Sequence, residues 1–147
     1  MELPPHVRPD PKLHGANRCF GCGPANSGGL HLEFLLAADQ TDAPSVVAEP
    51  VISSDFEGHP GYLHGGIIAT LIDETMSKAV RARGFIAMTR HMEVDYLRPV
   101  PSGKPLRLEG RTTRNEGRKH WAEAKILDAE GTILAQGKGL FIEVRPR

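Results

Sequence analysis

The feature that most constrains the fold is a central segment with apolar residues at helical spacing. The pattern runs from position 67 to position 80, follows a Gly/Pro-rich loop at 55–66, and stops at Gly84. It therefore predicts one long helix with an apolar stripe. The residues that form the stripe are Ile67, Ile68, Leu71, Ile72, Met76, Ala79 and Val80.

Short strands are predicted on both sides of this helix. Two precede it, at 30–37 and 45–53, and four follow it, at 86–96, 105–114, 118–128 and 132–144. In the first of the later strands, alternation predicts one shared face for Ile86, Met88, Met92, Val94 and Tyr96. Links of hairpin length join the last strands. This order predicts an α+β fold, in which a mainly antiparallel sheet of about six strands packs on one helix.

The prolines near the N-terminus divide the chain into two parts. Four of them fall within residues 1–18, which we expect to form an extended arm, and 19–147 is expected to form one domain. The domain begins with turn-forming residues at 19–29.

Charge and hydropathy exclude two classes of partner. The chain of 147 residues carries 18 basic and 18 acidic residues, so it lacks the positive charge of a general nucleic-acid binder. No apolar run approaches the roughly 20 residues that span a membrane, and no signal peptide is evident at the N-terminus. We expect a soluble, cytoplasmic protein.

The start of the predicted helix is a candidate anion site. Gly65 and Gly66 expose the backbone where helix N–H groups lack internal partners, so the Gly65 N–H can stabilise negative charge on a carbonyl oxygen. The alternative is that these glycines only allow a sharp turn into the helix.

Two adjacent carboxylates follow on the same helix. Glu74 has Lys78 four residues later, which is typical of a solvated face with a surface ion pair. Asp73 borders the apolar stripe, where desolvation makes a carboxylate a stronger base. Asp73 is therefore the candidate base or nucleophile, unless it simply reaches water at the rim of the stripe.

Gly65 and Asp73 are too far apart to act on one bond from a single chain. Eight residues separate them, which is roughly 12 Å along a helix axis. If both groups act on one carbonyl, they come from different protomers, so the spacing predicts a two-fold dimer with shared sites.

The pattern His-Gly-Gly at 64–66, opening a long helix with Asp73 nine residues after His64, resembles the PaaI-type hotdog-fold acyl-CoA thioesterases. The segments CFGCGPANSGGL, GHPGYLHGG, MTRHMEVDYLRPVPSG and EGRKHW add to the resemblance, which covers about residues 19–144. It implies a hotdog fold, with the sheet wrapped around the helix, and hydrolysis of an acyl-CoA thioester.

The resemblance also implies roles for individual residues. The Gly65 N–H would polarise the carbonyl, Asp73 of the partner protomer would act as base or nucleophile, and His64 would hydrogen-bond nearby. Thr89 would help to orient water, although it also suits an ordinary strand. Many relatives carry Asn where this chain has Gly58, which would give Thr89 more weight.

Contacts with coenzyme A and the acyl group follow from the same resemblance, and no cofactor or metal is implied. Arg118 and Lys119 are the first candidates for the phosphates, and Arg90 and His91 the second, although basic residues at strand ends are often only solvated. The acyl slot would be lined by Phe56, Tyr62 and Leu63, which could equally cap the core. Gly66 is a further candidate for contact with the substrate.

Other functions fit the sequence less well. Cys19 and Cys22 form a C-x-x-C that could be redox-active or half of a zinc site completed by His14 and His31, but a turn with packed thiols is preferred. A G-x-S-x-G elbow and the His/Asp pattern of a hotdog dehydratase are both missing. The main alternative is a non-catalytic acyl-CoA sensor. Dimers of this kind can also pair into tetramers.

Overall fold

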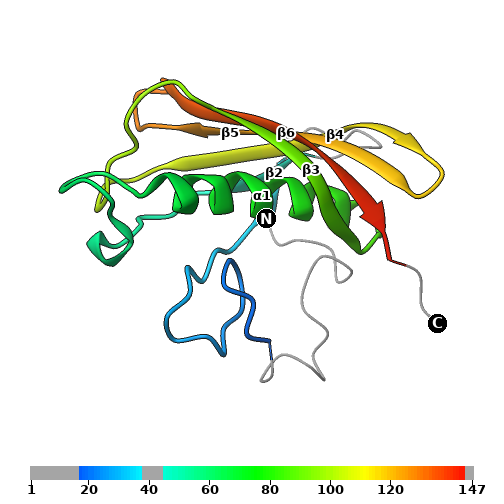
Figure 1. Cartoon of the computed structure of the whole chain (residues 1–147), viewed down its shortest axis with the longest axis horizontal. Helices are drawn as coiled ribbons and strands as arrows, with labels where there is room; N and C mark the ends of the chain where they lie inside the picture. The colour runs from blue at the N-terminus through cyan, green and yellow to red at the C-terminus, as the bar shows by residue number, and fades with distance from the viewer. Residues whose placement is uncertain (1–16, 38–44, 145–147) are drawn as a thin grey trace.

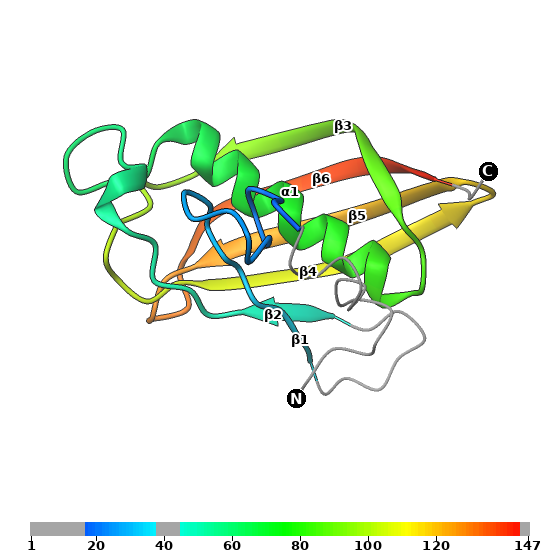
Figure 2. The same cartoon turned by 90° about the horizontal axis from the view of Figure 1, so that it is seen from below.

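The computed structural model describes residues 17–37 and 45–144. Within these ranges, one antiparallel sheet of six strands wraps around one α-helix, α1 (Gly65–Ala82), which lies across one face of the sheet (Figures 1 and 2). The strands are β1 (Leu35–Leu36), β2 (Val46–Ala48), β3 (Ala87–Tyr96), β4 (Arg107–Glu116), β5 (Lys119–Leu127) and β6 (Ile133–Glu143). A short 3₁₀ helix, η3 (Ser54–Phe56), precedes α1. The α+β class predicted from the sequence is confirmed.

The order of the strands in the sheet is β1-β2-β4-β5-β6-β3, and neighbouring strands are antiparallel. The last three strands form a meander joined by hairpins. β3 follows α1 directly in the chain but pairs with β6, so it lies at one edge of the sheet. Within the described chain, the edge of β3 that faces away from β6 has no partner strand. β3 also contacts α1.

The predicted apolar stripe faces the sheet and forms the centre of the core. Leu71, Ile72, Met76 and Ala79 are fully buried there. Glycines in the strands let the helix approach closely. A Cβ at Gly137 would lie 2.5 Å from Ile72 Cγ2 and 2.9 Å from the Glu93 carbonyl oxygen, so no other residue fits without a shift. Similar close approaches occur at Gly110 and Gly139.

The two strands before the helix are shorter than predicted. The expected strand at 30–37 is reduced to β1, because Leu30 N and Leu32 N donate to the carbonyls of Phe20 and Gly21 instead of to a neighbouring strand. The second expected strand is reduced to β2 and an isolated bridge at Val51. Pro50 lies between the two and has no N–H to donate.

A β-bulge in β3 makes the predicted face of this strand wrong. The register shifts between Thr89 and His91, so Arg90 is an extra residue without a partner in β6. Met92 is half-buried after the bulge, whereas Met88 before the bulge is 65% exposed. A one-residue insertion reverses which side chains point to each face of a strand. Met88 therefore lies on the opposite face from Met92, and the prediction that they share a face is wrong.

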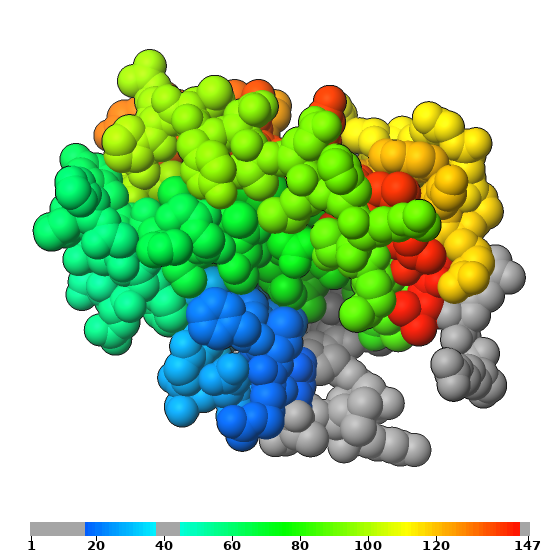
Figure 3. All heavy atoms as spheres, in the orientation of Figure 1, coloured from blue at the N-terminus to red at the C-terminus, as the bar shows by residue number. Residues whose placement is uncertain are grey.

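The segment at 17–32 lies on the face of α1 that the sheet leaves open (Figures 1 and 2). In the space-filling view this segment, in blue, packs against the helix and the loop that precedes it (Figure 3). Phe20 contributes an edge-to-face contact with Phe56, with 6.0 Å between the ring centroids. Of the predicted N-terminal arm, residues 1–16 lie outside the described residues. Within the described ranges, no helix is long and apolar enough to cross a membrane.

Candidate active site

His64 caps the start of α1 and determines which backbone amide remains available there. Its backbone is extended, with φ −61° and ψ 141°, and its Nδ1 accepts a hydrogen bond of 2.9 Å from the Gly66 N–H. Among residues 17–37 and 45–144, the Gly65 N–H has no acceptor. The candidate oxyanion donor is therefore the amide that the cap leaves unpaired at the positive end of the helix dipole.

The loop before the helix holds His64 in position through its backbone. His64 N donates to the Phe56 carbonyl at 3.0 Å, and Leu63 N donates to the Val100 carbonyl at 2.8 Å. Gly58 lies against the histidine, since a Cβ at this position would be 3.2 Å from His64 Cα. A side chain at position 58 would need His64 to shift by a few tenths of an ångström, so the glycine allows the closest approach of the loop to His64.

A second contact at the helix start involves Tyr96, a residue that the sequence analysis did not assign to the site. Its hydroxyl donates to the Gly65 carbonyl oxygen at 3.0 Å. Tyr96 ends β3 and lies 31 residues from Gly65 in the chain, so no local pattern could have paired the two. The bond ties the start of the helix to the edge strand.

Asp73 and Thr89 are brought together halfway along the helix. Thr89 Oγ1 donates to Asp73 Oδ1 over 2.6 Å, across the side of α1 that faces β3. Asp73 is half-buried and Thr89 is exposed. A hydroxyl that donates to the carboxylate fixes its orientation and can still accept a hydrogen bond from a water molecule.

Glu74 does not lie on a solvated face, contrary to the prediction. Its ion pair with Lys78 is present, with 3.8 Å between Oε1 and Nζ, but the Glu74 side chain is only 13% exposed. The turn at 19–22 covers it, and a Cβ on Gly21 would lie 2.7 Å from Glu74 Oε2. The helical spacing correctly predicted that Glu74 lies on the side of α1 away from the apolar stripe. It could not predict that the turn at 19–22 packs on that side.

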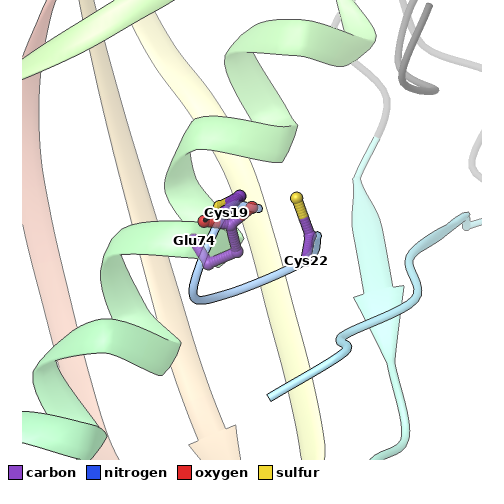
Figure 4. Close-up of side chains that lie close together, drawn as sticks. All are labelled: Cys19, Cys22 and Glu74. Atoms are coloured by element: carbon purple, nitrogen blue, oxygen red, sulfur yellow. Dashed lines mark hydrogen bonds between the residues drawn. The ribbon is translucent and has the colours of Figure 1, made fainter. Parts of the chain in front are cut away.

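The cysteines of the C-x-x-C lie beside Glu74 (Figure 4). Both are free thiols, and Lys78 Nζ is 3.4 Å from Cys22 Sγ. Burial and the nearby Glu74 carboxylate raise the pKa of the Cys22 thiol to about 12. Because thiolates are the reactive species in disulfide exchange, this environment disfavours redox chemistry at Cys22. His31, one of the ligands considered for a zinc site, hydrogen-bonds the Asn26 carbonyl instead.

The four basic candidates for phosphate binding share one end of the sheet with Thr89. Arg90 and His91 form the bulge in β3, and both are exposed. Arg118 and Lys119 lie where the β4–β5 hairpin meets the end of β6, because Lys119 and Met88 both pair with Ile142. Arg118 donates to the Glu143 carbonyl at 2.9 Å, so part of its hydrogen-bonding capacity is already used.

The three candidates for the acyl slot lie at the opposite end, beside Gly65 and Gly66. Tyr62 is exposed and Phe56 is half-buried. Leu63 is only 5% exposed and belongs to the hydrophobic core. In the single chain, Leu63 therefore supports the loop from beneath and does not line an open surface. The candidate residues thus form two groups, one at the start of α1 and one that extends from Asp73 and Thr89 to the β4–β5 hairpin.

Comparison with known proteins gives consistent results for sequence and fold. A family model described as the thioesterase superfamily matches residues 60–135. The Rattus norvegicus protein acyl-coenzyme A thioesterase THEM4 is 35% identical over 91 residues, which make up 61% of this chain and 39% of that protein. The chain therefore spans less than half the length of the THEM4 relatives that it matches.

Solved structures extend the likeness beyond the region matched in sequence. A crystal structure of a thioesterase superfamily protein has a TM-score of 0.78 at 28% identity, and covers 86% of this chain and 63% of its own. The Escherichia coli PaaI protein has a TM-score of 0.68 at 16% identity, over 79% of this chain and 81% of its own. These matches confirm the hotdog fold predicted from the sequence.

Proposed function

The chain belongs to the thioesterase superfamily, and on that premise we propose that it hydrolyses the thioester bond of an acyl-CoA. The observation that carries this proposal is the pair of groups along one side of α1. The unpaired Gly65 N–H at the start of the helix can bind an oxyanion, and the carboxylate of Asp73, held by Thr89, can act on water or on the carbonyl carbon.

In the proposed reaction, the thioester carbonyl oxygen accepts a hydrogen bond from the Gly65 N–H. Asp73 takes a proton from water, the water oxygen attacks the carbonyl carbon, and the negative charge moves to the carbonyl oxygen. The tetrahedral intermediate then expels the thiolate of coenzyme A, which takes the proton from Asp73. Direct attack by the Asp73 carboxylate, which forms an anhydride that water then cleaves, needs the same groups.

The roles of His64 and Thr89 follow from their hydrogen bonds. His64 accepts from the Gly66 N–H, so it orients the first turn and, among the described residues, leaves the Gly65 N–H as the unpaired amide of that turn. Thr89 donates to Asp73 Oδ1 and can accept from the attacking water, which would align that water with the carboxylate. Both are positioning residues in this proposal.

The active enzyme is proposed to be a homodimer, because each site needs groups from two chains. Gly65 and Asp73 are eight residues apart, roughly 12 Å along the helix axis. In the chain both lie beside the unpaired edge strand β3, with Tyr96 contacting Gly65 and Thr89 contacting Asp73. Two β3 strands that pair antiparallel about a two-fold axis near Met92 would bring Thr89 opposite the partner subunit's Tyr96. Asp73 would then face the partner's Gly65.

Exposed apolar side chains next to this edge support the same assembly. Ile86, Met88, Tyr96 and Leu97 are each more than half exposed in the single chain. An edge strand with such side chains favours pairing with another strand. A tetramer made of two such dimers is compatible with this arrangement.

The dimer would also unite the two groups of substrate contacts. Phe56, Tyr62, Leu63 and Gly66 lie at the Gly65 end, where the acyl group would bind with Leu63 as support. The basic candidates Arg90, His91, Arg118 and Lys119 lie at the Thr89 end, where they can bind the phosphates of coenzyme A. Each proposed site therefore combines one end from each protomer.

The first test is release of the coenzyme A thiol from a panel of short, medium, long and aromatic acyl-CoA esters. We expect turnover by the wild type and a loss of at least about a hundredfold in Asp73→Asn. Asp128→Asn is the matched control, because Asp128 caps a turn through Oδ1, which asparagine retains. Equal turnover by wild type and Asp73→Asn would rule out the proposed role of Asp73. Binding of the esters without cleavage by the wild type would favour the acyl-CoA sensor.

A further inference from the structure

A second group of chemically active side chains lies on the open face of α1, where the turn at 19–22 meets the helix. Each of Cys19, Cys22 and Glu74 offers one ligand atom, and these three atoms lie within 4.8 Å of one another (Figure 4). Two thiols and one carboxylate from segments 52 residues apart thus converge on one point. The proposed thioesterase reaction does not use any of them.

The spacing of these atoms suits a tetrahedral metal ion. Zinc binds sulfur at about 2.3 Å and carboxylate oxygen at about 2.0–2.2 Å, which separates neighbouring ligand atoms by roughly 3.5–3.8 Å. Cys19 Sγ and Glu74 Oε2 are 3.8 Å apart. Small rotations of the side chains would therefore bring the trio into coordination distance. We propose that Cys19, Cys22 and Glu74 bind a Zn²⁺ ion that fastens the turn at 19–22 to α1.

The turn is built so that the two thiols face the helix. Gly23 N donates to the Cys19 carbonyl at 2.8 Å, and Leu32 N donates to the Gly21 carbonyl at 2.8 Å. A Cβ at Gly23 would lie 2.3 Å from Cys19 N, so the turn can close only with glycine there. Glycine at position 21 likewise allows contact with Glu74. The turn therefore holds both cysteines over one carboxylate.

Lys78 is compatible with a metal at this point, because the charges balance. Metal binding would displace the protons of both thiols. The two thiolates and one carboxylate then carry three negative charges, and a divalent ion with the Lys78 ammonium carries three positive charges. Lys78 Nζ lies 3.4 Å from Cys22 Sγ and 3.8 Å from Glu74 Oε1. From there it can donate to a coordinating thiolate, as residues around a metal's direct ligands commonly do.

The fourth position can be taken by water. A hollow of about 260 Å³ adjoins the cluster, and Asn17, Ser77 and Lys78 are among its lining residues. The two sulfur ligands favour zinc over calcium or magnesium, which prefer all-oxygen sites. The metal would then join the helix and the turn at the point where Cys19 Sγ already contacts Glu74 and Lys78 contacts Cys22.

Metal binding can be tested directly on the full chain kept reduced. We expect one Zn²⁺ per chain by competition with a chromophoric chelator, and a Co²⁺ form with thiolate charge-transfer and tetrahedral d–d absorption. Cys19→Ser/Cys22→Ser should lower the affinity by at least about a hundredfold and remove the charge-transfer bands. Glu74→Gln should lower the affinity about tenfold or more, and Glu33→Gln, an exposed glutamate elsewhere, should not change it.

A second readout separates binding at this site from binding elsewhere on the surface. Zn²⁺ should raise the melting temperature of the wild type, and a chelator should reverse the rise. The double cysteine variant should show neither effect, with its circular dichroism confirming the fold. Equal Zn²⁺ affinity in the wild type and the double variant, or a Co²⁺ spectrum without thiolate bands, would overturn the proposal.

Discussion

One histidine side chain at the start of α1 controls the chemistry of the neighbouring backbone. His64 Nδ1 binds the Gly66 N–H and leaves the Gly65 N–H unpaired within the described chain. Since Gly65 is the first helical residue, its amide points out of the helix without an internal acceptor. The Gly65 N–H is therefore available to an oxyanion for two reasons: the His64 side chain binds the next amide, and Gly65 has no side chain that would block access.

This donor can be removed without removing the helix. Proline is favoured at the first helical position and has no N–H, and the extended backbone of His64 is compatible with a following proline. We expect Gly65→Pro to lower kcat by about a hundredfold to a thousandfold, with little change in the urea unfolding midpoint. Gly65→Ala keeps the N–H, and its Cβ would lie 3.8 Å from the nearest atom, in Tyr96. Its activity should stay within a few-fold of wild type, and equal losses in both variants would contradict the proposed donor.

The contact between Thr89 and Asp73 gives a second prediction at this scale. A hydrogen bond to a charged group contributes about 1.5–3 kcal/mol, so Thr89→Val should lower kcat by roughly tenfold to a hundredfold. Thr89→Ser keeps the hydroxyl and should restore most of the rate, which steady-state kinetics on a cleaved ester would measure. An unchanged kcat in Thr89→Val would show that the residue only fills the strand.

At the scale of elements, glycines in the strands allow α1 to pack closely on the sheet. Gly137 in β6 lies under Ile72 and beside the backbone of β3. A methyl group there would meet the Glu93 carbonyl at 2.9 Å, and a backbone atom cannot move aside as easily as the end of a side chain. The distance between α1 and the edge strand therefore depends on this glycine.

We expect Gly137→Ala to lower the free energy of unfolding by about 1–3 kcal/mol, measured by urea denaturation. Gly28→Ala is the matched control, because its Cβ would have only an ordinary contact at 3.7 Å with Asn26 Oδ1. The control should differ little from wild type. If the wild type and both variants had the same free energy of unfolding, α1 and β6 could move apart enough to admit a methyl group without loss of stability.

At the scale of the whole molecule, Gly65 lies at the start of α1 and Asp73 lies halfway along it, and the proposed dimer brings Gly65 of one chain next to Asp73 of the other. This arrangement predicts complementation between two inactive variants. Mixing Asp73→Asn with Gly65→Pro under conditions that exchange subunits should recover about a quarter of wild-type activity, because half of the dimers are mixed and each has one intact site. Each variant alone should stay inactive. No recovery, with exchange confirmed by mass spectrometry, would place both groups in one chain's site.

Much of the fold could be predicted because its strongest determinants are local. The apolar stripe specifies α1, and the turn residues near Gly117 and Gly131 separate the last three strands, whose ends lie within two residues of prediction. The short strands before the helix were overestimated, since their hydrogen bonds depend on which distant segment lies beside them. The bulge at Arg90 was missed because nothing in the local sequence marks it.

The sequence by itself determined three features: a helix that starts with an unpaired backbone N–H at Gly65, the Asp73 carboxylate beside the apolar stripe of this helix, and a sheet that covers the stripe. These are properties of spacing along one helix, which is fixed at 3.6 residues per turn. Only the tertiary structure decided that Thr89 binds Asp73, that Tyr96 binds Gly65, and that Glu74 lies under the cysteine turn. These contacts join segments 16 to 55 residues apart. They depend on how helix, edge strand and N-terminal turn pack together, and no local pattern encodes that packing.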